Sequence, residues 1–177
     1  MIQVLSSRRI AVRNIYLQTL SKYVFTNIGY NLKPLDLQGA IGLVQLEKFQ
    51  EIDERRKQSK RRLQAIIEQH LDQVYVPSEL PGADTCWFGT PLVCPDKATK
   101  QSLVEYFERN KVQTRNYFAG NILLQPAYRH LDEAANYPNA NVVLDRVFFI
   151  GAAPHYQEPV FAYMEDLLAS CACSNAA

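Results

Sequence analysis

Residues 29–46 read GYNLKPLDLQGAIGLVQL and give the clearest indication of how this chain folds. Pro34 suits the first turn of a helix, because its missing N–H would have no intrahelical partner there. No other proline occurs before Leu71, and from Leu35 to Leu46 apolar side chains leave no clear polar face. A helix that is apolar nearly all round is buried on several sides. We therefore expect a long buried helix, packed within one subunit or between two.

Two glycines, Gly39 and Gly42, lie inside this helix, where each costs about 1 kcal/mol relative to alanine. Such glycines are easier to explain if another backbone or a ligand approaches closely. After Phe49 the pattern narrows to an apolar stripe on a charged helix, made of Ile52, Ser59, Leu63, Ile66 and Ile67. Either one helix runs through or a break falls near residues 50–53.

Shorter β-prone and helical segments alternate downstream. We expect strands at residues 74–76, 85–93, 112–118 and 142–150, a helix from Asp96 to about Asn110, and a closing helix at 157–170. A turn with a short helix is expected at 119–130, and a polar loop at 132–141. This alternation predicts an α/β or α+β domain with a small mixed or antiparallel sheet flanked by helices.

Composition excludes several classes of protein. The 177 residues suffice for one domain with a sizeable core, and the net charge of +1 gives no bulk attraction to nucleic acid or membrane. No transmembrane run exists, and Arg8, Arg9 and Arg13 interrupt what could have been a secretory signal. Cys86, Cys94, Cys171 and Cys173 lack the spacing of a metal site. We expect a cytoplasmic protein with no membrane partner and no metal.

One basic run could contact a nucleic-acid backbone. It comprises six positive charges within residues 55–62, namely Arg55, Arg56, Lys57, Lys60, Arg61 and Arg62. On a helix these charges spread round much of the circumference, and acidic residues between Glu47 and Glu54 can pair with several of them. A solvated, partly paired face is the better interpretation, so no nucleic-acid partner is expected.

A second informative run, residues 113–121, reads QTRNYFAGN and is followed by Gln125-Pro126. On a strand, Arg115 would share a face with Gln113 and Tyr117. A planar guanidinium there could hold a diphosphate bidentately, although a lone arginine on a sheet more often faces solvent.

Residues 29–46 resemble the signature that precedes the C-terminal domain of DegT-like sugar aminotransferases, which use pyridoxal phosphate (PLP) on nucleotide-linked sugars. The FAGN run and Trp87-Phe88-Gly89 resemble the nucleotide-sugar 3-dehydratases, including those of CDP-3,6-dideoxyhexose and GDP-colitose synthesis. Together the resemblances cover most of residues 23–168. Asn116 and Tyr117 replace mainly apolar residues, and Leu124 stands where an arginine is often found, so the nucleotide and the sugar stay open.

The resemblance implies the C-terminal small domain of a fold-type I aminotransferase. Residues 1–33 would be a remnant or linker of the cofactor domain, 34–72 the linking and dimer-interface helices, 73–170 the C-terminal domain, and 171–177 a tail. Family members are more than twice as long, so the chain is expected to be incomplete and inactive alone. No catalytic residue is assigned within it.

The resemblance also assigns binding residues. Asn31 matches the asparagine that contacts the PLP phosphate of the neighbouring subunit, and Lys33 stands where many aminotransferases have arginine. Both are expected to complete the site of PLP, or of its amino form PMP, across a homodimer. Contacts with the nucleotide-sugar substrate are expected from Trp87, Arg115, Phe118 and Asn121.

The Asn-Leu-Lys and FAGN runs favour the dehydratase branch, in which a 4-keto-6-deoxy sugar loses its C3 hydroxyl on the way to lipopolysaccharide O-antigen deoxysugars. One alternative is a nucleotide-sugar aminotransferase of the same family. Another is a non-catalytic interaction module, a truncated homologue that retains the dimer helix. Whether an iron–sulfur cluster takes part stays open.

Overall fold

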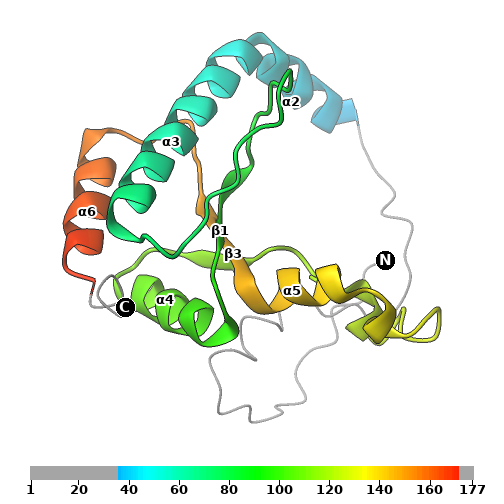
Figure 1. Cartoon of the computed structure of the whole chain (residues 1–177). Helices are drawn as coiled ribbons and strands as arrows, with labels where there is room; N and C mark the ends of the chain where they lie inside the picture. Colours follow the sequence, from blue (N-terminus) through cyan, green and yellow to red (C-terminus); the bar gives the residue numbers. More distant parts are fainter. Residues whose placement is uncertain (1–35, 172–177) are drawn as a thin grey trace.

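The computed structural model describes residues 36–171 of the chain. Its elements, in chain order, are α2 (Asp36–Glu47), α3 (Phe49–His70), β1 (Gly89–Val93), α4 (Lys97–Arg109), β2 (Thr114–Asn116), the 3-10 turns η1 (Ile122–Leu124) and η2 (Ala134–Asn136), α5 (Pro138–Arg146), β3 (Val147–Gly151) and α6 (Glu158–Ala169). Figure 1 shows this order along the fold.

The three strands form one antiparallel sheet in the order β1-β3-β2. Successive residues of a strand point to opposite faces of the sheet. Phe148 and Ile150 therefore share one face, where they belong to the hydrophobic core, and Phe149 points the other way. The predicted domain with a small mixed or antiparallel sheet flanked by helices is confirmed, and the sheet is antiparallel.

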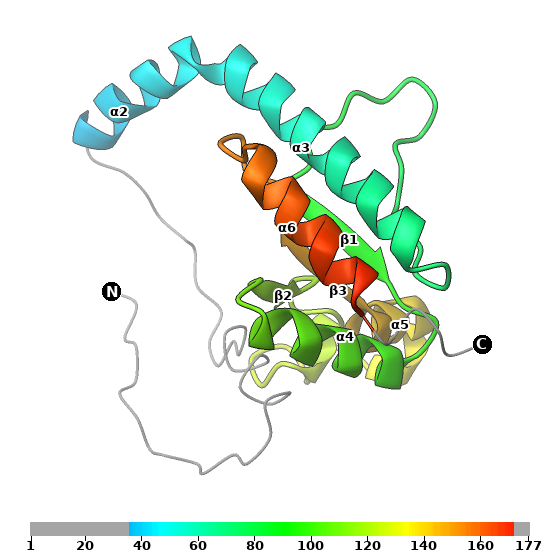
Figure 2. The same cartoon turned by 90° about the vertical axis from the view of Figure 1, so that its left-hand side faces the viewer.

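Three helices, α3, α4 and α6, cover the core face of the sheet, as Figures 1 and 2 show. On α3 the predicted stripe is buried over most of its length, since Ser59, Leu63, Ile66 and Ile67 are all buried and only Ile52 is partly exposed. From the other two helices the core receives Leu103, Phe107, Phe161, Met164, Leu167 and Leu168. This layer of helices holds α3 against the sheet. The N-terminal half of α3 is thereby positioned near the end of the sheet where β1 begins and β3 ends.

Helix α4 begins as predicted. Asp96 is its N-cap, and Oδ1 of that side chain accepts a hydrogen bond from the backbone N–H of Thr99 at 2.8 Å. This bond satisfies one of the amides that a helix start leaves without an intrahelical partner. It also lowers the pKa of Asp96.

Helix α2 differs from the expectation of burial. None of its residues is buried among residues 36–171, and Leu37, Leu43 and Leu46 each expose more than 60% of their surface. The break before α3 falls at Lys48, slightly earlier than residues 50–53. Figure 2 shows α2 extending beyond the layer of α3, α4 and α6. Burial of α2 against the described part of its own subunit is therefore wrong, and burial between subunits stays a prediction.

Three predicted strands are shorter than expected. Residues 74–76 contribute a single bridge, Tyr75 to Val93, because Pro77 has no N–H with which to continue a ladder. The strand at 112–118 is reduced to β2, because Lys111 and Phe118 both take positive φ values, 62° and 53°, that leave the extended conformation. Similarly, residues 85–88 lie outside the sheet and β1 begins only at Gly89.

The predicted strand at 142–150 is wrong over its first half. Residues 142–146 belong to α5, which begins with Pro138 in its first turn, and only Val147–Gly151 forms β3. A short apolar run fits a buried strand or a helix equally well, and the helix-start signal of Pro138 lay inside the predicted polar loop at 132–141. Lys100 then donates to the carbonyl of Leu144 at 2.6 Å, which satisfies an acceptor in the last turn of α5.

Among residues 36–171 no helix combines the length and the apolar character that crossing a membrane requires.

Candidate functional site

A cleft of about 260 Å³ opens where β1 begins and β3 ends. Its lining includes Arg56 from α3, Gln113 and Arg115 from the β2 segment, and the rings of Phe88 and Phe149. Residues 151–153 complete the lining from the β3 side. The cleft thus combines two guanidinium groups and an amide with an aromatic wall.

Arg115 reaches the cleft because of the alternation expected for its strand. Thr114 and Asn116 are buried on the core face, whereas Arg115 is exposed on the opposite face. Gln113 shares the cleft with it. Gln113 and Arg115 therefore both line the cleft, whereas Tyr117, which was predicted to share their face, lines the neighbouring hollow. The common strand face stays a prediction, because β2 spans only Thr114–Asn116.

Arg56 is the site residue that sequence reasoning missed, because it was counted with the solvated basic run. Its Nε atom is buried and has no hydrogen-bond partner among residues 36–171. The spacing held a signal, since Ile52, Arg56, Ser59 and Leu63 follow one another at helical intervals on the same stripe. A buried donor without an acceptor is costly, so this position fits an anionic oxygen from a ligand.

A group of aromatic rings adjoins the cleft and shares Phe88 and Phe149 with it. Phe149 is 5% exposed, and Phe88 and Phe118 flank it with ring centroids at 5.5 and 6.2 Å. Trp87 and Tyr117 complete the lining of a small hollow of about 50 Å³. Gly89 makes this packing possible, because a Cβ there would lie 2.6 Å from Cδ2 of Phe149.

Phe118 stands on a strained backbone. Its φ of 53° is in the left-handed region, an unusual conformation for a bulky residue that costs roughly 1–3 kcal/mol. Gly120 follows with φ 62° and packs so closely on Leu144 that a Cβ would lie 2.6 Å from the leucine Cβ. The loop is therefore held in a shape that places the Phe118 ring on the surface.

Asn121 stabilises the loop that contains Phe118 and Gly120. Its side-chain nitrogen donates to the carbonyl of Ala134 at 3.0 Å and to Oδ1 of Asn141 at 2.8 Å, and its oxygen accepts from the N–H of Leu123 at 3.0 Å. The side chain is only 2% exposed. Asn121 thus acts on the site through the position of the loop, and its predicted contact with substrate stays a prediction.

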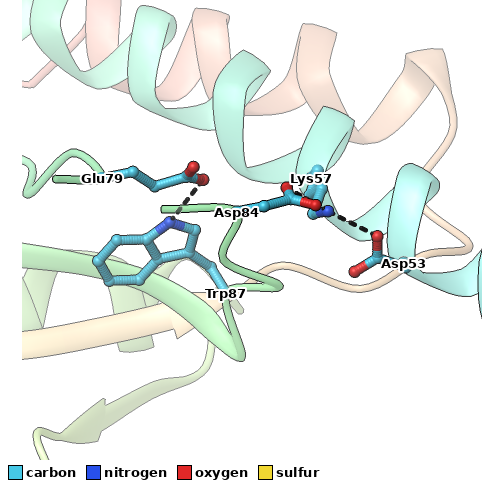
Figure 3. A network of polar contacts seen from close by, with 5 residues as sticks. All are labelled: Asp53, Lys57, Glu79, Asp84 and Trp87. Atoms are coloured by element: carbon cyan, nitrogen blue, oxygen red, sulfur yellow. Dashed lines mark hydrogen bonds and ion pairs between the residues drawn. The ribbon is translucent and has the colours of Figure 1, made fainter. Parts of the chain in front are cut away.

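Trp87 lies at the edge of the aromatic group and is fixed from two sides. Figure 3 shows its indole N–H pointing at Glu79, to whose Oε1 it donates at 3.3 Å. On the other side, Nζ of Lys60 lies 4.9 Å from the ring centroid. A cation at this distance from an aromatic face is attracted to it.

An ion-pair network attaches residues 84–88, the segment that carries Trp87, to α3. Lys57 lies between Asp53, at 2.7 Å, and Asp84, at 2.5 Å (Figure 3). The hydrogen bond from Lys57 lowers the pKa of Asp53, and the two carboxylates raise the pKa of Lys57. Residues 84–88 consequently follow α3 before entering β1, which brings Phe88 close to Arg56.

The basic run of α3 is largely paired, as expected from its acidic neighbours. Arg55 bonds Glu51 at 2.9 Å, and Arg62 makes two 2.7 Å hydrogen bonds to Glu158. Lys60 is buried and donates to the carbonyl of Pro77 at 2.8 Å. Arg56, with its unbonded Nε, differs from all of these.

The residues assigned to the PLP phosphate, Asn31 and Lys33, lie outside residues 36–171, as do residues 1–33 and the tail from 172 onward. Within the described part of the chain no cluster of histidine, cysteine and acidic side chains could hold a metal ion.

Comparison with known proteins shows the family. Residues 5–164 match the model of the DegT/DnrJ/EryC1/StrS aminotransferase family, and the chain belongs to that family.

Two curated relatives are similar to this chain in sequence. The chain is 33% identical over 152 residues to dTDP-4-dehydro-2,6-dideoxy-D-glucose 3-dehydratase of Saccharopolyspora spinosa, a match that covers 84% of this chain and 33% of the relative. It is 31% identical over 137 residues to the lipopolysaccharide biosynthesis protein RfbH of Salmonella typhimurium, covering 75% and 31%. The chain thus spans about a third of the length of the curated relatives that it matches.

Solved structures share the fold. GDP-4-keto-6-deoxy-D-mannose-3-dehydratase of E coli, solved with bound hydrated PLP, matches with a TM-score of 0.62 at 21% identity, covering 83% of this chain and 38% of the enzyme. The aminotransferase TlmJ of Streptoalloteichus hindustanus matches with a TM-score of 0.67 at 19% identity, covering 81% and 38%.

Proposed function

We propose that the chain is the C-terminal portion of a PLP- or PMP-dependent enzyme that removes the C3 hydroxyl of a nucleotide-linked 4-keto-6-deoxy sugar. The proposal is supported by the relatives, several of which are named as nucleotide-sugar 3-dehydratases. The lipopolysaccharide biosynthesis relative supports a role in deoxysugar synthesis for the cell surface. A location in the cytoplasm is a further part of the proposal.

The observation that carries the proposal is the pairing of Arg56 and Arg115 in one cleft. Arginine is the side chain best suited to bidentate recognition of phosphate oxygens. The unbonded Nε of Arg56 gives such an oxygen a buried donor, and the exposed guanidinium of Arg115 supplies further donors. A diphosphate, the group that links nucleotide and sugar, matches this arrangement.

The remaining predicted residues have separate roles in this proposal. Trp87 and Phe118 bind the organic part of the substrate, and Asn121 holds the loop that carries Phe118. Asn31 and Lys33 complete the cofactor phosphate site of a partner subunit. Bound PLP or PMP supplies the electron sink for loss of the hydroxyl, and the part of the enzyme that this chain does not span holds most of it. The chain alone is accordingly inactive.

Formation of a homodimer is the second part of the proposal. Helix α2 exposes Leu37, Ile41, Leu43, Val44 and Leu46 on one short segment. Its glycines, Gly39 and Gly42, have no described atom within 4 Å of the position of an added Cβ, so a second backbone can approach there. Contiguous exposed apolar surface of this kind marks a protein interface.

Two other functions compete with dehydration. An aminotransferase of the same family fits the fold equally well, because solved aminotransferases share it. A non-catalytic module that only associates through α2 is favoured by the exposed apolar surface of that helix. Dependence of diphosphate binding on the cleft separates the enzyme proposals from the module.

The experiment is a calorimetric titration of the 177-residue chain with dTDP-, GDP- and CDP-hexoses. Arg56→Met and Arg115→Met are compared with Arg55→Met, whose parent residue pairs with Glu51 outside the cleft. We expect binding of at least one nucleotide sugar, weakened about tenfold or more in the two cleft variants and unchanged in Arg55→Met, because a hydrogen bond to a charged group contributes roughly 1.5–3 kcal/mol. No binding, or equal binding by all four proteins, would overturn the diphosphate site.

A further inference from the structure

Phe88 and Phe118 present two nearly parallel rings at the surface. Their centroids are 6.4 Å apart with an interplanar angle of 26°, and the residues are 63% and 56% exposed. Phe149 supports both from below and is almost fully buried. The pair therefore forms an aromatic surface on a rigid base.

Burial does not explain this arrangement. The fold holds Phe118 at a φ of 53°, and the result of that strain is a ring that stays more than half exposed. Strained residues that are held in place by their surroundings gather at ligand sites. Asn121 and Gly120 hold this loop, so the exposure of the ring is built into the structure.

The aromatic surface and the anion cleft are continuous. Phe88 and Phe149 line both of them, whereas Arg56 and Arg115 line only the cleft and Phe118 only the hollow. A ligand with a diphosphate beside the two arginines would carry its next group directly onto the phenylalanine rings. Among the described residues, no acidic side chain lines either place, so none of them repels an anionic ligand there.

We propose that Phe88 and Phe118 form the stacking surface for the nucleobase of the nucleotide whose diphosphate binds between Arg56 and Arg115. The inference rests on the proposed function. It adds the orientation of the substrate, with the diphosphate at the arginines and the nucleobase on the phenylalanine rings. Every nucleobase has a π-face that stacks on an aromatic ring, so the surface accepts several bases. Selection among nucleotides then has to come from protein groups that contact the edge of the base.

The test uses Trp87, the only tryptophan of the chain, as a fluorescent reporter beside the aromatic surface. The full chain is titrated with a nucleoside diphosphate and, separately, with inorganic pyrophosphate, and calorimetry gives independent affinities. Phe88→Leu and Phe118→Leu keep an apolar side chain but remove the π-face. Tyr75→Leu is the matched control, because Tyr75 is also exposed but pairs with Val93 at the far end of β1.

We expect the nucleoside diphosphate to bind at least about fivefold more tightly than pyrophosphate, and both phenylalanine variants to lose that advantage. Phe118→Leu should still bind pyrophosphate normally, because Phe118 lies outside the lining of the cleft. Tyr75→Leu should behave as the wild-type chain does. Equal affinity for the two ligands, with binding still dependent on Arg115, overturns the stacking surface and leaves the diphosphate site intact. If the wild-type chain binds neither the nucleoside diphosphate nor pyrophosphate, the diphosphate site is overturned as well. If Phe118→Leu weakens only self-association in sedimentation, the rings serve a protein interface and the inference is wrong.

Discussion

Nζ of Lys60 lies 4.9 Å from the centre of the Trp87 ring, so a buried cation of α3 touches the loop that leads into β1. The same ammonium donates to the carbonyl of Pro77 at the start of that loop. Burial lowers the pKa of Lys60, which shows that its charge is kept in a partly desolvated place. Lys60 therefore connects both ends of residues 77–87 to α3.

Replacing Lys60 with methionine should detach this loop. Lys60→Met keeps the apolar stem but removes the charge over Trp87 and leaves the Pro77 carbonyl without its donor, so we expect a loss of about 1–3 kcal/mol of unfolding free energy. Trp87 emission should shift to the red as the ring becomes wetter. Urea unfolding followed by fluorescence measures both. Arg61→Met, at an exposed neighbouring position, is the control and should change stability by less than about 0.5 kcal/mol.

The buried lysine of α4 predicts a pH dependence. Lys100 is 1% exposed, and burial lowers its pKa to about 8 from an ordinary value of 10.5. Between these pH values the unfolded chain still holds the proton that the folded chain has released, so stability rises with pH in this window. The full contribution is about 3–4 kcal/mol, since a pKa shift of one unit corresponds to roughly 1.4 kcal/mol.

Comparison with Lys100→Met isolates that contribution. Cys94, Asp145 and Lys97 are the groups that act electrostatically on Lys100, and they remain in the variant. The difference in unfolding free energy between wild type and variant should grow in favour of the wild type as the pH rises from about 8 to 10.5. A constant difference over this range would show that Lys100 keeps an ordinary pKa in the folded chain. Loss of the bond to Leu144 adds only a pH-independent offset.

The exposed face of α2 predicts self-association. Leu43→Asp places a charge on the apolar segment and should shift the chain from dimer to monomer in sedimentation velocity, with little change in the stability of the monomer, since Leu43 is 66% exposed. Leu80→Asp is the matched control, because Leu80 is 79% exposed but lies in the loop after Pro77. A wild-type chain that is monomeric at every concentration tested would contradict the dimer proposal.

The contact between Gly89 and Phe149 gives a prediction about packing. In Gly89→Ala the new methyl group would lie 2.6 Å from the Phe149 ring and 2.7 Å from the carbonyl oxygen of Ile150. Such overpacking costs about 1–3 kcal/mol, which thermal unfolding can measure. Because Phe149 supports both aromatic rings of the surface, ligand binding should weaken as well. Gly42→Ala, with open space around it, should leave the monomer at least as stable.

The sequence predicted the elements that depend on local signals. The Asp96 cap, the apolar stripe of α3 and the alternation that exposes Arg115 follow from short-range chemistry, and the structure confirms all three. The extent of the strands could not be predicted, because the positive φ values that interrupt the extended backbone fall at Lys111 and Phe118 and not at glycines.

The candidate site was predicted only in part for a similar reason. Arg56 looked like one charge among six, and its role depends on a loop from residues 84–88 that reaches it only in the folded chain. For Asn121 the sequence predicted a contact with substrate, which stays a prediction, but it did not predict the bonds to Ala134 and Asn141 in the turn that follows. Contacts between distant segments of this kind leave no periodic pattern in a sequence.

The most direct test of the central claim is an NMR titration that follows the arginine Nε–H signals while a nucleoside diphosphate is added to the chain. The account predicts saturable shifts for Arg56 and Arg115, with Arg55 and Arg129 unchanged, because only the first two line the cleft. Single arginine-to-lysine variants assign the signals. Binding of the nucleotide with no shift at Arg56 or Arg115 would contradict the account.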